Sequence, residues 1–184
     1  MPWPDRLDDA HIWKRRPAKL VFLSLMTALA MVLQILESLL PNPVPWIRLG
    51  LANIVILIVL SLFGIGEGLM VTGLRVVLAA TLLGTIFGPT FWLSLSGGLC
   101  STIAMGFFMD FFPEKFSIIG ISIIGAYVHN LVQLLVASLF IVHQSSLIYL
   151  LPVLLVTALI AGCVTGIIAN VLMKKMEGQW SFSS

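Results

Sequence analysis

Hydrogen-bonding side chains within one strongly apolar segment could bind a small molecule inside a membrane. The stretch SIIGAYVHNLVQL places small and polar residues three and four positions apart, the spacing of neighbours on one helical face. These residues are Ser122, Ala126, His129, Asn130 and Gln133. Amide and imidazole groups in such a helix either bond to neighbouring helices or line a polar cavity. The residues alone leave both interpretations open.

Two arginines, Arg48 and Arg75, lie in or beside apolar sequence, and each could either bind a ligand or form a structural contact. Arg75 lies about seven residues into its predicted helix, or about 10 Å deep, so its guanidinium cannot easily reach water. A charge in a bilayer costs about 2.5 to 3.5 kcal/mol and therefore needs a partner, a cavity or a function. Arg48 lies nearer the membrane surface and is followed by Asn53, while Glu37 is the candidate counter-ion for either arginine.

These charges allow two interpretations. Glu37 could form a structural ion pair with Arg75 or Arg48, or one cation could remain to bind a carboxylate or phosphate, which arginine holds through two parallel hydrogen bonds. The candidate ligand or gate residues are Arg48, Arg75, Asn130 and Gln133, supported by Glu37, Asn53 and His129.

Membrane-spanning helices must position these residues. The 184-residue chain is 59% hydrophobic and 10% charged, with a mean hydropathy of +1.09, whereas a soluble domain carries about 25% charged residues. A helix needs roughly 20 apolar residues to cross a bilayer. The sequence therefore predicts an all-α membrane protein with six transmembrane helices, at about 18–37, 47–64, 68–87, 91–110, 117–142 and 147–173.

Positive charges at the ends of the chain predict its orientation. Seven of the ten cations flank the apolar body: Arg6, Lys14, Arg15, Arg16, Lys19, Lys174 and Lys175. The positive-inside tendency then places both termini in the cytoplasm, with an even number of spans. We expect a cytoplasmic basic segment at 1–17, a six-helix transmembrane domain at 18–173 and a cytoplasmic tail at 174–184. The basic stretch abuts a membrane segment, so we expect it to set topology and contact lipid, with no nucleic acid as partner.

Irregular stretches gather on the side predicted to face outward. PNPVPWIRLGLAN, residues 41–53, and LLGTIFGPTFWLSLSGG, residues 82–98, combine proline or glycine with polar side chains. Non-helical backbone at membrane depth is tolerated where protein or a water-filled cavity surrounds it. We therefore expect a ligand pocket that opens outward.

Small residues four apart predict close helix contacts. The stripe Ala158, Gly162, Gly166 and Asn170 is the clearest, and internal packing is its expected role, although one such stripe could meet a partner subunit. Cys100 and Cys163 lie in apolar sequence without metal-ligand spacing, so we expect no metal, disulfide or cofactor site.

Four ordered stretches resemble a bacterial membrane family, the Gx transporters, also labelled heptaprenyl diphosphate synthase component I. They are PNPVPWIRLGLANIVIL, LRVVLAATLLGTIFGP, LSLSGGLCSTIAM and FSIIGISIIGAYVHNLVQL, and the resemblance runs from about residue 20 to 173. That family is similar to the S components of energy-coupling factor (ECF) importers, six-helix proteins that capture a micronutrient from outside.

The resemblance implies an S-component-like bundle in the inner or plasma membrane of a bacterium, and together with the arginines it predicts that this bundle binds a small, anionic or amphipathic solute. It also implies a pocket in the outer half, partly gated by the loop between the first two helices, and a small-residue face on the first helix, at Ser24 and Ala28, that docks on a transmembrane scaffold. The chain lacks a phosphate-binding loop, so ATP-driven uptake requires separate ATPase subunits.

Two alternatives come from other functional classes. The family's second label implies a noncatalytic membrane subunit for heptaprenyl diphosphate, and hence isoprenoid or menaquinone, synthesis. Catalysis itself would need clustered carboxylates to hold magnesium and diphosphate, and the adjacent acidic pair here is Asp8 and Asp9, in the N-terminal segment. The other alternative is a scaffold in a quinone- or flavin-linked electron-transfer assembly. We therefore expect no catalytic residues, and a binding protein rather than an enzyme.

Overall fold

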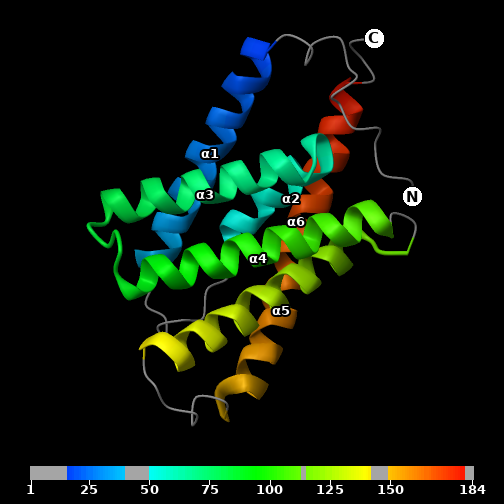
Figure 1. The fold of residues 1–184 in the computed structure, drawn as a ribbon. Helices are drawn as coiled ribbons and strands as arrows, with labels where there is room; N and C mark the ends of the chain where they lie inside the picture. The colour runs from blue at the N-terminus through cyan, green and yellow to red at the C-terminus, as the bar shows by residue number, and fades with distance from the viewer. Residues whose placement is uncertain (1–15, 40–49, 113–114, 142–148, 181–184) are drawn as a thin grey trace.

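The computed structural model of the protein describes residues 16–39, 50–112, 115–141 and 149–180. These residues form six α-helices and no strand (Figure 1). The helices are α1 Arg16–Leu39, α2 Leu51–Phe63, α3 Ile65–Leu82, α4 Pro89–Phe111, α5 Ile118–Val136 and α6 Leu151–Trp180. A π-helical turn, Ala137–Ile141, extends α5. The predicted all-α architecture is confirmed.

Helix α2 forms the centre of the bundle and lies behind α3 and α4 in Figure 1. Its sequence LANIVILIVLSLF is apolar on every face, which is typical of a helix buried all round, and 11 of its 13 residues are buried. At 1.5 Å per residue it is about 20 Å long, shorter than the hydrocarbon core of about 30 Å. Because α2 is buried by its neighbours, it serves as the core around which the other helices pack.

The other five helices are long and apolar enough to cross a membrane. Their outer faces expose large apolar side chains, for example Leu25 and Leu36 on α1, Leu135 on α5 and Ile160 on α6. A protein in water rarely exposes so much contiguous apolar surface, whereas lipid covers it without cost. The protein is thus a multi-pass membrane protein.

Several helix boundaries differ from the predicted ones because glycine turns the chain earlier. Helices α2 and α3 are joined by Gly64 alone, which adopts φ 94°. Helix α3 ends at Leu82, five residues before the predicted end, because Gly84 at φ 66° and Phe87 at φ 60° reverse the chain before Pro89 starts α4. Proline suits that first turn, since its missing N–H would be unbonded there anyway.

The last helix continues beyond its predicted end at residue 173 and reaches Trp180. Lysine, methionine and glutamate follow residue 173, and these are good helix formers that add no reason to stop. The first part of the expected tail, up to residue 180, is therefore helical.

Helices α5 and α6 cross at very short range through the predicted glycine stripe. A methyl group added at Gly162 would lie 2.7 Å from the Cα of Ile123, and one added at Gly166 would lie 2.8 Å from the Cα of Ile119. The stripe serves internal packing, as expected. The close approach also allows the hydroxyls of Ser122 and Thr165 to hydrogen-bond at 2.8 Å.

The bundle has two chemically different ends. At the lower left of Figure 1, α1 and α3 finish and α4 begins, and the end of α5 and the start of α6 lie on the same side; we call this the pocket end. At the opposite end the Nζ of Lys19 bonds Glu67 Oε1 at 2.7 Å and lies 5.2 Å from the centre of the Phe63 ring. That contact joins α1 to α2 and α3 away from the pocket.

Candidate functional site

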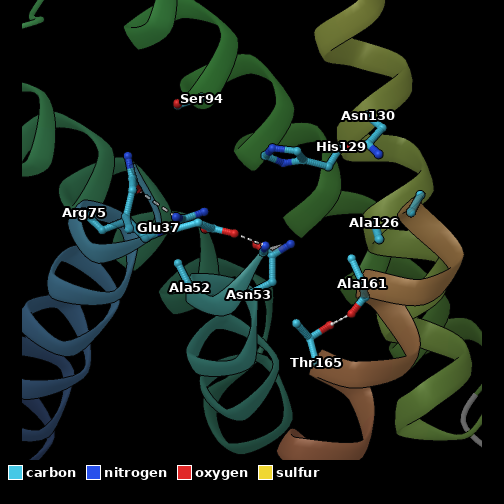
Figure 2. Close-up of a pocket in the computed structure, with 13 residues that line it drawn as sticks. Glu37, Ala52, Asn53, Arg75, Ser94, Ala126, His129, Asn130, Ala161 and Thr165 are labelled. Atoms are coloured by element: carbon cyan, nitrogen blue, oxygen red, sulfur yellow. Dashed lines mark hydrogen bonds between the residues drawn. The ribbon is translucent and has the colours of Figure 1, made fainter. Parts of the chain in front are cut away.

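A small polar cavity lies toward the pocket end and is lined by all six helices (Figure 2). Its polar lining residues are Gln34, Glu37, Asn53, Arg75, Ser94, His129, Asn130 and Thr165. Alanines at positions 52, 126, 158 and 161 complete the wall and keep the helices close together. The space open to the centres of water-sized molecules is about 30 Å³. That volume suits two or three water molecules, each of which needs about 10 to 15 Å³.

Arg75 brings a buried positive charge to this cavity. Its side chain is 5% exposed, and Nη1 donates a hydrogen bond to Gln34 Oε1 over 2.9 Å. A methyl group at Gly98 would lie 3.4 Å from Arg75 Nη2, so that glycine leaves room for the guanidinium. A guanidinium has five N–H donors pointing in several directions. Arg75 can therefore contact other groups of the cavity in addition to Gln34.

Glu37 is held at the start of α2. Its carboxylate accepts a hydrogen bond from the backbone N–H of Gly50, the N-cap residue of α2. Gly50 adopts φ 75°, a left-handed conformation that glycine takes without strain. The positive end of the helix dipole favours a carboxylate at this position.

Two hydrogen bonds thus anchor the two buried charges, one from Arg75 to Gln34 and one from Gly50 to Glu37. Figure 2 shows Glu37 between Arg75 and Asn53, with His129 pointing toward them from α5. The backbone N–H of Asn53 donates to Gly50 O over 2.8 Å, which places Asn53 in the first turn of α2. The ion pairing of Glu37 with either arginine stays a prediction.

The polar face of α5 divides into cavity lining and helix ties. Ala126, His129 and Asn130 line the cavity, and Asn130 Nδ2 also donates to the backbone oxygen of Leu154 in α6 over 3.1 Å. Gln133 instead lies between α5 and α4, where its Nε2 donates to Leu93 O over 3.5 Å. The same face of α5 therefore does both things that the sequence left open: part of it lines a polar cavity, and part of it bonds to neighbouring helices.

Three polar lining residues are absent from the predicted binding set. The sequence gives little signal for two of them. Ser94 is one of several hydroxyl residues in the glycine-rich stretch 82–98, and Thr165 lies next to Gly166 of the small-residue stripe in α6. Gln34 is a polar residue within an apolar helix, 6% exposed in the fold, and that rarity is the signal that could identify it. Arg48 and the rest of residues 40–49 lie outside the described residues, so the role of Arg48 stays a prediction.

The predicted docking residues Ser24 and Ala28 are both exposed on α1. Large apolar side chains on the same helix are exposed beside them, namely Leu20, Val21, Leu25 and Leu29. Docking of this face on a scaffold stays a prediction. Among the described residues no group of three or more His, Cys, Asp or Glu side chains could hold a metal ion.

Comparison with solved structures shows the fold class of this bundle. The chain is similar to the S component of a bacterial ECF transporter, with a TM-score of 0.69 and 16% sequence identity over 90% of this chain and 99% of that one. No curated protein matches the chain in sequence. A family model described as heptaprenyl diphosphate synthase component I matches residues 26–172, most of the chain. The protein belongs to the heptaprenyl diphosphate synthase component I family.

Proposed function

We propose that the protein is the solute-binding membrane subunit of an ECF-type importer and that it captures a small, anionic or amphipathic solute from outside. The observation that carries this proposal is Arg75, a buried cation in a polar cavity lined by all six helices. Similarity of the fold to an S component supports it. The protein would bind and pass on the solute without changing it chemically.

The chemistry of the cavity favours an anionic group. The cavity holds two buried charges, Arg75 and Glu37, and Glu37 accepts a hydrogen bond from the Gly50 N–H at the start of α2. The guanidinium of Arg75 matches a carboxylate or phosphate in shape and charge. His129, Asn130 and Asn53 lie around the same space and can donate or accept further hydrogen bonds.

The proposed orientation follows from the positions of the charges. Lys19 lies near the start of α1, Lys115 between α4 and α5, and Lys174 and Lys175 near the end of α6, all at the end opposite the pocket. Cytoplasmic loops carry excess lysine and arginine. In this proposal the protein lies in the inner membrane of a bacterium with both termini cytoplasmic and the pocket end outward. The exposed face of α1 with Ser24 and Ala28 then docks on the scaffold that carries the ATPases.

The test is ligand retention by the protein purified in mild detergent, with mass spectrometry to identify and quantify what is bound. We expect Arg75→Ala to lower retention about tenfold or more, because a charge-assisted hydrogen bond contributes roughly 1.5 to 3 kcal/mol. Arg75→Lys should retain an intermediate amount, since it keeps the charge but loses the bidentate geometry.

Lys115→Ala is the matched control, because it removes an exposed cation at the opposite end of the bundle. Each variant is compared only if it elutes as a single species in gel filtration. Wild-type retention in folded Arg75→Ala would contradict the anion site, and with it the proposed function.

A second candidate is a noncatalytic membrane subunit of prenyl diphosphate synthesis, which the description of the matching family favours. Co-purification separates the two candidates. Recovery with ATPase subunits supports the importer, whereas stoichiometric recovery with a soluble prenyl synthase supports the second candidate.

A further inference from the structure

A second and larger cavity adjoins the polar one at the pocket end, between α1, α3 and α4. We call it the side cavity. Its space open to the centres of water-sized molecules is about 320 Å³, compared with about 30 Å³ for the polar cavity. Its lining is mixed, with five apolar residues, Leu39, Val76, Ala80, Leu83 and Phe91, and five polar ones, Gln34, Ser38, Thr85, Thr90 and Ser94. Its size falls within the range of about 300 to 1,000 Å³ that is usual for small-molecule sites.

The two cavities share part of their walls. Gln34 and Ser94 line both of them, and each side chain is 6% exposed. Gln34 is also the residue that accepts the hydrogen bond from Arg75. A group that replaced Gln34 as the partner of Arg75 would therefore touch the polar cavity on one side and the side cavity on the other.

The two cavities differ in charge and in volume, as the head and the body of an amphiphile do. The polar cavity holds the buried charges but is too small for more than a head group, whereas the side cavity has more volume, no charged lining residue among those described, and a mixed lining of apolar residues with hydroxyl and amide groups. Neither alone provides both charge recognition and room. A ligand that reached across Gln34 and Ser94 would use both.

The side cavity lies next to a turn that is suited to the membrane interface. Between α3 and α4 the chain exposes Ile86 by 42% and Phe87 by 73%. The rings of Phe87, Phe91 and Trp92 stack edge to face, with centroids 5.8 and 5.2 Å apart. Tryptophan is enriched at the level of the lipid head groups. Amphiphiles gather at that level, with their heads toward water.

We propose that the ligand is amphipathic, with an anionic head bound at Arg75 and Gln34 and an apolar body lying in the side cavity between α1, α3 and α4. This inference rests on the proposed solute-binding function and narrows its ligand to a class. Such a ligand has two sources with the same chemistry, a membrane lipid with an anionic head or a free amphiphile that reaches the membrane surface.

The first experiment uses the full-length protein in lipid nanodiscs with photoreactive probes. One probe is a decanoic acid with a diazirine near the chain end, and the other is a phosphatidic acid with the same group on one chain. We expect crosslinks in the peptide that carries Val76 to Phe91. Unlabelled decanoate should compete, whereas acetate, which lacks the apolar body, and decanol, which lacks the charge, should not.

Crosslinking by decanoic acid alone assigns the ligand to free amphiphiles, and crosslinking by phosphatidic acid alone assigns it to lipids. In either case Arg75→Ala must lower the yield about tenfold, as expected for the loss of the ionic contact. A yield that is the same in Arg75→Ala and wild type would identify lipid adsorbed on the outside of the bundle and would overturn the proposal.

Variants that fill the side cavity test the apolar half. Ala80→Phe places a ring in its wall, and Thr90→Phe does so from the first turn of α4, where the residue is exposed and a change is less disruptive to folding. We expect each to lower retention of the natural ligand and crosslinking about tenfold. Leu159→Phe is the control, since that side chain is exposed on the outside of α6.

These outcomes separate the inference from the function on which it rests. If Arg75→Ala loses the natural ligand while folded Ala80→Phe and Thr90→Phe both retain it, the side cavity does not hold the ligand and the proposed function stands. If neither kind of variant changes retention, the solute-binding site itself is wrong. Loss in all three variants, with Leu159→Phe unchanged, supports the head-and-body site.

Discussion

Arg75 is tolerated inside the bundle because its neighbours bond to it and leave it space. Gln34 accepts its hydrogen bond, and Gly98 lies beside the guanidinium, with no side chain to displace it. The same glycine packs against Thr72, which is fully buried and shares a 2.9 Å hydrogen bond with Thr102. A single position therefore links the packing of α3 and α4 to the geometry of the proposed binding site.

Replacing Gly98 should disturb both packing and binding. In Gly98→Ala the new methyl would lie 3.1 Å from Thr72 Cγ2 and 3.4 Å from Arg75 Nη2, and the hydrogen bond to Thr102 restrains Thr72 from moving away. We expect the free energy of unfolding to fall by about 1 kcal/mol, as for modest overpacking. Ligand retention should fall as well. Thermal unfolding in detergent and mass spectrometry measure the two effects.

Gly73→Ala is the matched control on α3. An added methyl there has no described atom within 4 Å, so alanine should stabilise the helix by roughly 0.5 to 1 kcal/mol. Equal stability changes in the two variants would show that contact with Thr72 and Arg75 does not limit position 98.

Among the helices, α5 and α6 position half of the polar cavity by crossing at backbone contact. Asn130 is bonded to Leu154 O and Ser122 to Thr165, and Asn130 and Thr165 line the cavity. These bonds require the helices to stay as close as Gly162 and Gly166 allow. In lipid, where apolar burial does not drive helices together, such small residues provide the close packing that joins them.

A larger residue at this crossing should separate the helices. In Gly162→Leu the side chain would meet the backbone of Ile123, whose Cα is 2.7 Å from the new Cβ position, and backbone cannot rotate away. We expect a loss of about 2 to 3 kcal/mol of stability, at the upper end for overpacking, together with loss of ligand. Gly66→Leu is the control, since position 66 is exposed with no described atom within 4 Å. Similar melting of both variants would contradict this account.

The exposed face of α1 allows a test of docking that leaves the pocket intact. Ser24→Trp and Ala28→Trp add bulk on the outside of the bundle, so we expect loss of co-purification with the scaffold and ATPases but normal ligand retention. Val164→Trp, on the exposed face of α6, should leave both unchanged. Recovery of the complete assembly with both α1 variants would exclude this face as the docking surface.

In the molecule as a whole, the two ends of the bundle differ in charge and in the groups that they expose. The pocket end carries the cavities and the exposed turn at Ile86 and Phe87, while exposed lysines lie at the other end. This asymmetry predicts a single orientation in the membrane. Access to the site from outside depends on that orientation.

Single cysteines can report the orientation in intact cells. With Cys100 and Cys163 changed to alanine, Ile86→Cys should react with a membrane-impermeant maleimide added outside, because that residue is exposed at the pocket end. Lys115→Cys, exposed at the opposite end, should react only after the membrane is permeabilised. The reverse pattern would place the pocket toward the cytoplasm and rule out capture from outside.

Composition and periodicity are enough to predict the class of fold and the chemical types in the site. A chain so poor in charge must lie in lipid, where backbone groups can be satisfied only within helices or closed barrels, and its long apolar segments match helices. Polar residues such as Arg75, Glu37 and Asn130 are identifiable because each is costly in lipid without a partner. The sequence predicts the positions of turns less well, and the predicted end of α3 is therefore later than its actual end at Leu82.

Which of these groups meet depends on how the helices pack. Helix α2 has the composition of a lipid-facing helix but is buried in protein, because apolar sequence does not distinguish lipid from protein as its surroundings. Arg75 meets Gln34, and Gln133 ties α5 to α4 rather than lining the polar cavity. The side cavity arises between α1, α3 and α4. These contacts depend on the distances between segments that are far apart in the chain. Helix packing determines those distances, and local sequence does not.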